Sequence, residues 1–269
     1  MHGKLLRICV SGLLIVGIFD GVTARAEESV DSIQERVLAL HGKIKSFSGR
    51  IESRFDSTLQ GAWVKSHTQG PVAYKFQDGK ILYRMDLKIE TMRESDAEKS
   101  TSREEQVLMS DGDYMYQSGV QNGEKIAYKA DVDSLQTCVP TKLFFGWLKR
   151  DYDLTVLPDE KVDGKDCWVI RAAKKSEEEV LQLKTVTFFR KDVPIMVKTV
   201  NYDRFDNVMQ VTEIRDIKLD VELDPEKFVF KAHSDTKIID QSTRSAESAA
   251  PNSAPAPAGS AAPTTAPAP

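Results

Sequence analysis

The side chains that could carry catalysis or bind a metal are scattered, and they form no known catalytic or metal-binding pattern. Asp111-Gly112-Asp113 offers two carboxylates, but no calcium-loop spacing follows and Asp-Gly is a hairpin turn signal. The acidic residues in 94–98 and 177–179 lie near lysines, and nothing there would desolvate a carboxyl group for general acid work. No serine stands in a Gly-x-Ser-x-Gly turn, and no glycine-rich phosphate loop follows a strand. The sequence therefore predicts no enzyme, no cofactor and no metal site.

Cys138 and Cys167 are the cysteines that remain once the N-terminal segment described next is removed. In an oxidising compartment they are a candidate disulfide, which would stabilise the fold by about 3 to 4 kcal/mol. Two buried free thiols are the alternative. Cys138 and Cys167 together with His41, His67 and His233 make no recognisable zinc pattern.

The N-terminus has the features of a secretory signal peptide. Lys4 and Arg7 precede an apolar run over residues 8–19, and small residues precede a cleavage point after Ala26. The run is shorter than the roughly 20 residues of a membrane-spanning helix. Cys9 lacks the small residue expected just before a lipidated cysteine. We expect residues 1–26 to be removed and the mature chain to be exported without a lipid anchor.

Composition divides the remainder into one domain and a tail. Six of the 11 prolines fall in the last 19 residues, within an Ala/Pro/Ser/Thr run almost without charge. Such a run cannot bury enough apolar surface to fold, so residues 241–269 are predicted to be a disordered tail and 27–240 a single domain. The net charge of −4 becomes more negative when the basic leader is lost, which argues against a nucleic-acid partner.

The domain opens with a predicted helix and continues with strands. Asp31 and Gln34 resemble a capping box, and the apolar stripe runs over Ile33, Val37, Leu40 and Ile44. From Phe47 onward the apolar period is two, as in antiparallel strands with one wet face. Asp-Gly and Asn-Gly pairs separate the alternating segments. We count about ten or eleven strands in meander order.

Two segments interrupt the alternation. Residues 92–105 are charged without an apolar period and are expected to be a solvated loop between strands. Residues 135–150 hold Pro140, where a helix could begin, and a dense apolar cluster around Leu143, Phe144 and Trp147. This second segment is predicted to be a short helix lying on the sheet.

The predicted fold is mainly β: an open, unclosed antiparallel barrel covered by the N-terminal helix and a short central helical lid. Two small helices cannot readily cover the whole apolar concave face, so a cavity between sheet and helices is expected, with complete filling by side chains as the alternative.

Three segments resemble the periplasmic lipoprotein carrier (LolA-like) superfamily, the outer-membrane lipoprotein-sorting type. They are residues 44–49 after the first helix, the strand and turn 107–116, and the ending 223–230. They occur in the family's order over about residues 29–240. The resemblance implies an unclosed barrel whose lid covers a cavity for acyl chains.

The resemblance also implies the role. We expect a periplasmic carrier or chaperone for lipid or lipoprotein acyl chains, with inner- and outer-membrane delivery proteins as candidate partners. The alternative is an envelope-stress sensor or protein-interaction module of the same fold. The residues expected to line the apolar cavity or its lid are Ile51, Phe55, Tyr83, Met85, Leu87, Met115, Leu143, Phe144, Trp147 and Met196. A residue of this kind taken singly is more often plain core than a ligand contact.

Overall fold

The computed structural model describes residues 28–40, 43–59, 61–121, 123–132, 139–175, 183–193 and 195–242. The predicted signal peptide and residues 243–269 of the predicted tail lie outside this part. The helices are α1 (Val30–Leu40) and α2 (Lys142–Asp151). The strands are β1 (Ser46–Leu59), β2 (Ala62–Gln77), β3 (Lys80–Glu94), β4 (Lys99–Ser110), β5 (Tyr114–Gln121), β6 (Glu124–Asp131), β7 (Tyr152–Val162), β8 (Lys165–Lys174), β9 (Lys184–Arg190), β10 (Met196–Tyr202), β11 (Val208–Leu219) and β12 (Lys237–Asp240).

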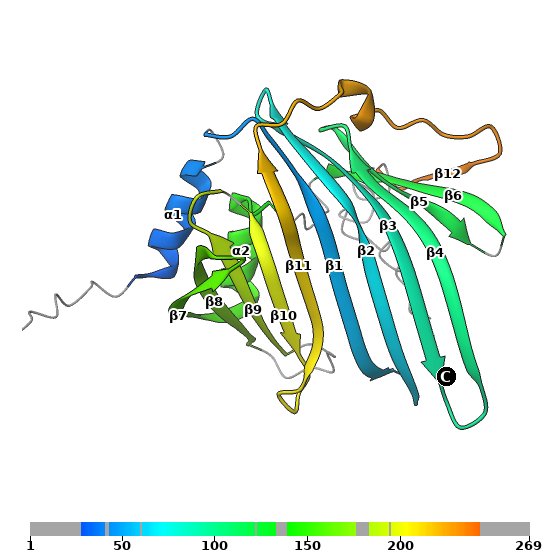
Figure 1. Ribbon diagram of the computed structural model, residues 1–269, viewed down its shortest axis with the longest axis horizontal. Helices are drawn as coiled ribbons and strands as arrows, with labels where there is room; N and C mark the ends of the chain where they lie inside the picture. Colours follow the sequence, from blue (N-terminus) through cyan, green and yellow to red (C-terminus); the bar gives the residue numbers. More distant parts are fainter. Residues whose placement is uncertain are drawn as a thin grey trace, which may run out of the picture.

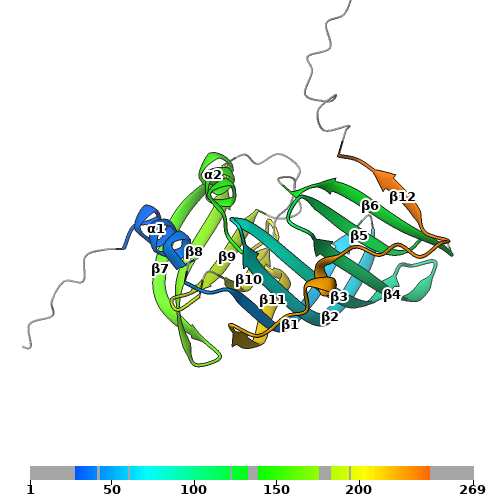
Figure 2. The same cartoon turned by 90° about the horizontal axis from the view of Figure 1, so that it is seen from above.

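The strands form one sheet of twelve, in the order β12-β6-β5-β4-β3-β2-β1-β11-β10-β9-β8-β7 (Figure 1). Each pairing is antiparallel except that of β12 with β6, which is parallel. Seen from above, the sheet bends into an open trough with α2 at its mouth (Figure 2). The predicted mainly β, unclosed architecture is confirmed, and β12 takes the sheet beyond the expected ten or eleven strands.

The hairpin turns are where the Asp-Gly pairs predicted them. Asp78 and Gly79 have φ of 52° and 75°, and Asp163 and Gly164 have 49° and 72°. Positive φ at both central residues is the geometry of a two-residue hairpin whose twist matches that of its strands. These turns fix the register of β2 with β3 and of β7 with β8.

The prediction of a solvated loop over residues 92–105 is wrong. β3 continues to Glu94, β4 starts at Lys99, and only 95–98 form the turn. Most side chains of β4 up to Glu105 are exposed. The segment has no apolar period because both faces of this protruding hairpin are exposed to water. Its two strands are stabilised by their backbone pairing rather than by burial of side chains.

α1 is capped by Ser29, the residue before its first, rather than by the predicted capping box. The Ser29 hydroxyl accepts a hydrogen bond from the Ser32 amide, while Asp31 and Gln34 both contact Lys149 of α2. Ile33 and Val37 are fully buried. Ile44 lies beyond the helix and packs into the main core, so the predicted helical stripe is one residue too long.

α2 is the predicted central helix, and it begins two residues after Pro140. Thr141 caps it by accepting a hydrogen bond from the Phe144 amide at 3.2 Å. Phe145 and Leu148 are its buried residues. Phe145 packs with Ile33, Val37, Trp168 and Phe189, which joins both helices to β8 and β9. The covering of the sheet by two helices is thus concentrated at one arm of the trough.

The face of the sheet that α2 covers, called the inner face below, carries a stack of aromatic rings. Phe47 on β1 and Tyr74 on β2 lie 4.6 Å apart between ring centroids, and Tyr74 and Tyr83 on β3 lie 5.4 Å apart. All three rings are buried. They form the floor of the trough beside the helices.

The segment after β11 crosses the opposite, outer face. Arg84 and Tyr116 alternate with the inner-face residues Tyr83 and Met115, so they point outward. The Arg84 guanidinium donates to the Lys227 carbonyl at 3.4 Å, and the Tyr116 ring stacks on Phe230 at 4.3 Å. β12 then pairs with the edge of β6. Neither helix in the described part of the chain is long and apolar enough to span a membrane.

Candidate functional site

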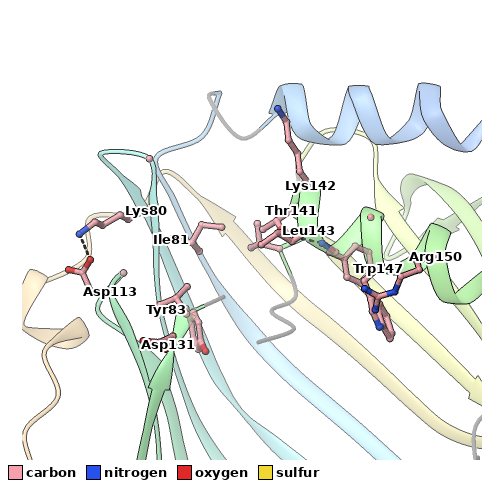
Figure 3. A pocket seen from close by; sticks show the side chains of 16 residues that line it. Lys80, Ile81, Tyr83, Asp113, Asp131, Thr141, Lys142, Leu143, Trp147 and Arg150 are labelled. Atoms are coloured by element: carbon pink, nitrogen blue, oxygen red, sulfur yellow. Dashed lines mark hydrogen bonds and ion pairs between the residues drawn. The ribbon is translucent and has the colours of Figure 1, made fainter. Parts of the chain in front are cut away.

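A cavity of about 1070 Å³ lies between α2 and the turn ends of β3 and β5 (Figure 3). On the strand side it is lined by Ile81 and Tyr83, and the Ile81 side chain points toward α2 (Figure 3). On the helix side it is lined by Leu143, Phe144 and Trp147. This volume is slightly above the roughly 300 to 1,000 Å³ typical of small-molecule sites.

Polar residues line the cavity as well: Lys80, Asp113, Asp131, Thr141, Lys142 and Arg150. Lys80 Nζ lies 2.6 Å from Asp113 Oδ1 across the turn ends, and this contact raises the pKa of Lys80. Arg150 is paired with Asp151 at 2.8 Å, and hydrogen bonding to Arg150 lowers the pKa of Asp151. These charges are thus paired at the exposed ends of their elements. The cavity lining thus combines apolar side chains with charged and polar ones.

Four of the ten predicted ligand-binding residues meet at this cavity: Tyr83, Leu143, Phe144 and Trp147. Tyr83 is buried, whereas Leu143 is 65% exposed at the start of α2. Phe144 and Trp147 are half-buried, with ring centroids 6.5 Å apart. The structure therefore brings the predicted lid residues and one predicted wall residue to the same site.

Five other predicted residues share the inner face without lining the cavity. The register places Ile51 and Phe55 of β1 on the same face as Met85 and Leu87 of β3. The pairings of β3 with β4 and of β4 with β5 place Met115 on that face too. They extend the apolar surface from the cavity along the strands.

Met196 lies apart from these residues. It is opposite Phe189 across an irregularity between β9 and β10, and it packs with the cluster beneath α1 and α2. The sequence offers no sign of this irregularity, so strand alternation alone could not place Met196 against the helices.

Four apolar residues of this region were not predicted as site residues, two in the cavity lining and two that attach α2 to the sheet. Ile81 and Val139 line the cavity, and Phe145 and Leu148 attach α2 to the sheet. The spacing of Phe145 and Leu148, three residues apart on a short helix, is a signal that could have identified the buried face.

Cys167 is fully buried, and in its thiol form burial raises its pKa to about 11. Cys138 lies outside the described residues. The disulfide between them stays a prediction. Among the residues that the structure places, no group of three His, Cys, Asp or Glu side chains could hold a metal ion.

No protein-family model matches the sequence, and no curated protein matches it. Solved structures of similar fold are found at low sequence identity. MucB has a TM-score of 0.45 at 13% identity, covering 77% of this chain and 64% of that chain, so this chain spans less than two thirds of MucB.

Two further likenesses cover nearly the whole of the other chain. An uncharacterized conserved protein from Thermus thermophilus has a TM-score of 0.46 at 10% identity, covering 78% of this chain and 99% of that one. A LolA superfamily protein from Nitrosomonas europaea has a TM-score of 0.30 at 14% identity, covering 74% and 97%. One of the MucB structures is a complex with MucA. All of these similarities have TM-scores below 0.5.

Proposed function

We propose that this protein is a periplasmic carrier that holds the acyl chains of a lipid or a lipid-modified protein in the cavity between α2 and the inner face. The observation that carries the proposal is the cavity of about 1070 Å³, which is lined by Ile81, Tyr83, Phe144 and Trp147 among other residues and adjoins the buried apolar residues of the inner face. Burial of an acyl chain there gains roughly 25 cal/mol per Å² of apolar surface removed from water. No covalent step is part of the function.

α2 is the element that would admit the ligand. It is attached to the sheet through Phe145 and Leu148, while Leu143, Phe144 and Trp147 present apolar surface to the cavity. A helix held by so few buried side chains opens at lower cost than the strands of the sheet, because local opening follows the amount of buried apolar contact.

The predicted export signal fits the same role. Cleavage of the N-terminal segment after Ala26 would make Glu27 the first residue of the mature protein, two residues before the Ser29 cap of α1. N-terminal sequencing of protein from a periplasmic extract tests this directly. Delivery proteins at the inner and outer membranes are the partners that a carrier would require.

Native mass spectrometry of the purified mature protein, with lipid extraction and titration of a fluorescent fatty-acid probe, tests the function. We expect a co-purifying lipid and saturable probe binding. Absence of both would overturn the carrier and favour the protein-interaction module.

A further inference from the structure

Two rows of side chains cross the inner face of the long strands beyond the apolar floor. Their positions follow from the strand register, which sets residues of six neighbouring strands side by side. The first row, called the threonine row, is Thr187, Thr199, Thr212, Ser53, Thr68 and Ile89. The second, called the amide row, is Thr185, Asn201, Gln210, Phe55, Ser66 and Thr91.

Hydrogen bonds connect these side chains across β9, β10, β11 and β1. The Thr185 hydroxyl donates to Asn201 Oδ1 at 3.1 Å, and Asn201 Nδ2 donates to Gln210 Oε1 at 3.0 Å. Gln210 Nε2 donates to the Ser53 hydroxyl at 3.0 Å, which lies 2.8 Å from Thr212 Oγ1. Each amide nitrogen uses one N–H in these bonds and has a second to offer. The network is therefore fixed in orientation and retains donors for a ligand.

Neither row contains a charged residue. On the outer face the same strands carry ion pairs: Lys198 with Glu213 at 3.0 Å, and His67 with Glu52 at 3.1 Å. Most members of both rows are only half-buried, so water could solvate a charged side chain on either face. Burial therefore does not explain why the rows contain no charge. The register sets Glu104 of β4 opposite Ile89, at the end of the threonine row. An anionic ligand group would therefore lose hydration on the inner rows without finding a counter-charge, whereas a neutral hydroxylated group would exchange one hydrogen bond for another.

Phe55 stands within the amide row, directly opposite Gln210 on one side and Ser66 on the other. Its ring is half-buried. A flat apolar ring framed by an amide and a hydroxyl suits a pyranose sugar, which has an apolar C–H face and hydroxyl groups around its edge.

An apolar track joins the rows to the cavity. Along β3, Tyr83 at the cavity is followed on the same face by Met85, Leu87 and then Ile89 of the threonine row. These six residue steps span about 20 Å, because a strand rises roughly 3.3 Å per residue. A ligand with its alkyl chain in the cavity could lie along this track and place its head group on the rows.

We propose that the inner rows bind the neutral sugar head group of a glycolipid whose acyl chain enters the cavity. The inference rests on the proposed function and specifies its ligand class. Lys142 at the cavity margin is the competing anchor, which would favour an anionic head group instead.

The test compares three ligands that share a twelve-carbon chain, each below its micelle concentration: n-dodecyl-β-D-maltoside, dodecylphosphocholine and laurate. Binding to the full mature chain is measured by displacement of the fluorescent fatty-acid probe. We expect the maltoside to bind at least tenfold more tightly than the other two. Equal affinities, or tighter binding of laurate, would overturn the head-group inference and leave the carrier function standing. Failure of all three to bind would instead overturn the carrier function.

Two variants test whether the inner rows contact the head group of the ligand. Gln210→Met keeps the side-chain length without the amide, and Phe55→Leu removes the ring; both are expected to weaken maltoside binding at least fivefold and laurate binding less than twofold. Arg54→Ala, on the outer face beside Phe55, is the matched control and should change neither. Thermal unfolding confirms that each variant is folded. Equal weakening of both ligands would show that the rows contact the chain rather than the sugar.

Discussion

The indole of Trp147 packs edge-on against the ring of Tyr152, with centroids 5.2 Å apart, where α2 passes into β7. Tyr152 is buried, and its hydroxyl pKa is raised by desolvation. Trp147 itself is half-buried and lines the cavity. One side of this indole thus contacts the fold, and the other is available to a ligand.

Trp147→Ala is expected to weaken binding of the fatty-acid probe several-fold. The loss of stability should stay well below the about 3 to 5 kcal/mol typical of removing a fully buried aromatic side chain. Denaturant unfolding and probe titration on the same preparation measure the two effects. A large loss of stability with unchanged binding would assign Trp147 to the structural core.

Phe145→Ala is the complementary change within the same helix. Phe145 is fully buried against Phe189, with ring centroids 5.7 Å apart, and does not line the cavity. We expect a loss of about 3 to 5 kcal/mol in the free energy of unfolding. Probe affinity of the remaining folded fraction should change little. A loss of binding without a loss of stability would contradict this division of roles.

Cys167 should resist thiol reagents in the folded protein. The thiolate is the reactive form, and a buried thiol with a pKa of about 11 supplies very little of it at pH 8. In reduced protein, modification of Cys167 should therefore require unfolding, as followed by mass mapping. In protein taken from an oxidising compartment, two reactive thiols after unfolding without reductant would exclude the predicted bond to Cys138.

Acid should destabilise the β9–β10 corner. The nearly buried Arg190 donates to both carboxylate oxygens of Asp192, at 2.8 and 2.7 Å, and these hydrogen bonds lower the pKa of Asp192. A lowered carboxyl pKa contributes stability that is complete above the unfolded value, about 3.9, and is lost as pH falls through the folded value.

Asp192→Asn should therefore flatten the decline of the unfolding free energy below about pH 4. Asp96→Asn, at the exposed β3–β4 turn, is the control and should leave that decline unchanged. An unaltered slope in Asp192→Asn would show that other carboxylates govern the acid response.

The sequence predicts the architecture well because local rules apply to most of it. Asp78-Gly79 and Asp163-Gly164 determine their turns through backbone geometry alone, and alternation identifies strands that have one wet face. The protruding β3–β4 hairpin was missed because alternation requires one buried face, and its charged residues have none. The cap at Ser29 was missed because Asp31 contacts Lys149, a tertiary partner that sequence spacing cannot show.

The candidate site was predicted only in part, because local patterns identify some of its residues and tertiary packing decides the others. Tyr83 and Trp147 could be chosen as large apolar residues on a strand face and a short helix. The helical face that packs on the sheet contains Phe145 and Leu148, and this depends on how α2 is rotated against β8 and β9. The inner rows could not be identified, since Ser53 and Gln210 become neighbours only through a pairing of strands far apart in the chain.

The pairing of β1 with β11 also governs how the molecule assembles. Partners such as Ser53 and Thr212 are separated by 159 positions, whereas β1–β6 and β7–β11 each pair consecutive strands. Contacts of high sequence separation form slowly because loop closure precedes any gain from them. Two meanders can therefore form first and dock afterward along β1 and β11. The hydrogen-bonded chain from Asn201 to Ser53 crosses that seam, so the onset of head-group binding during refolding would mark the docking step itself.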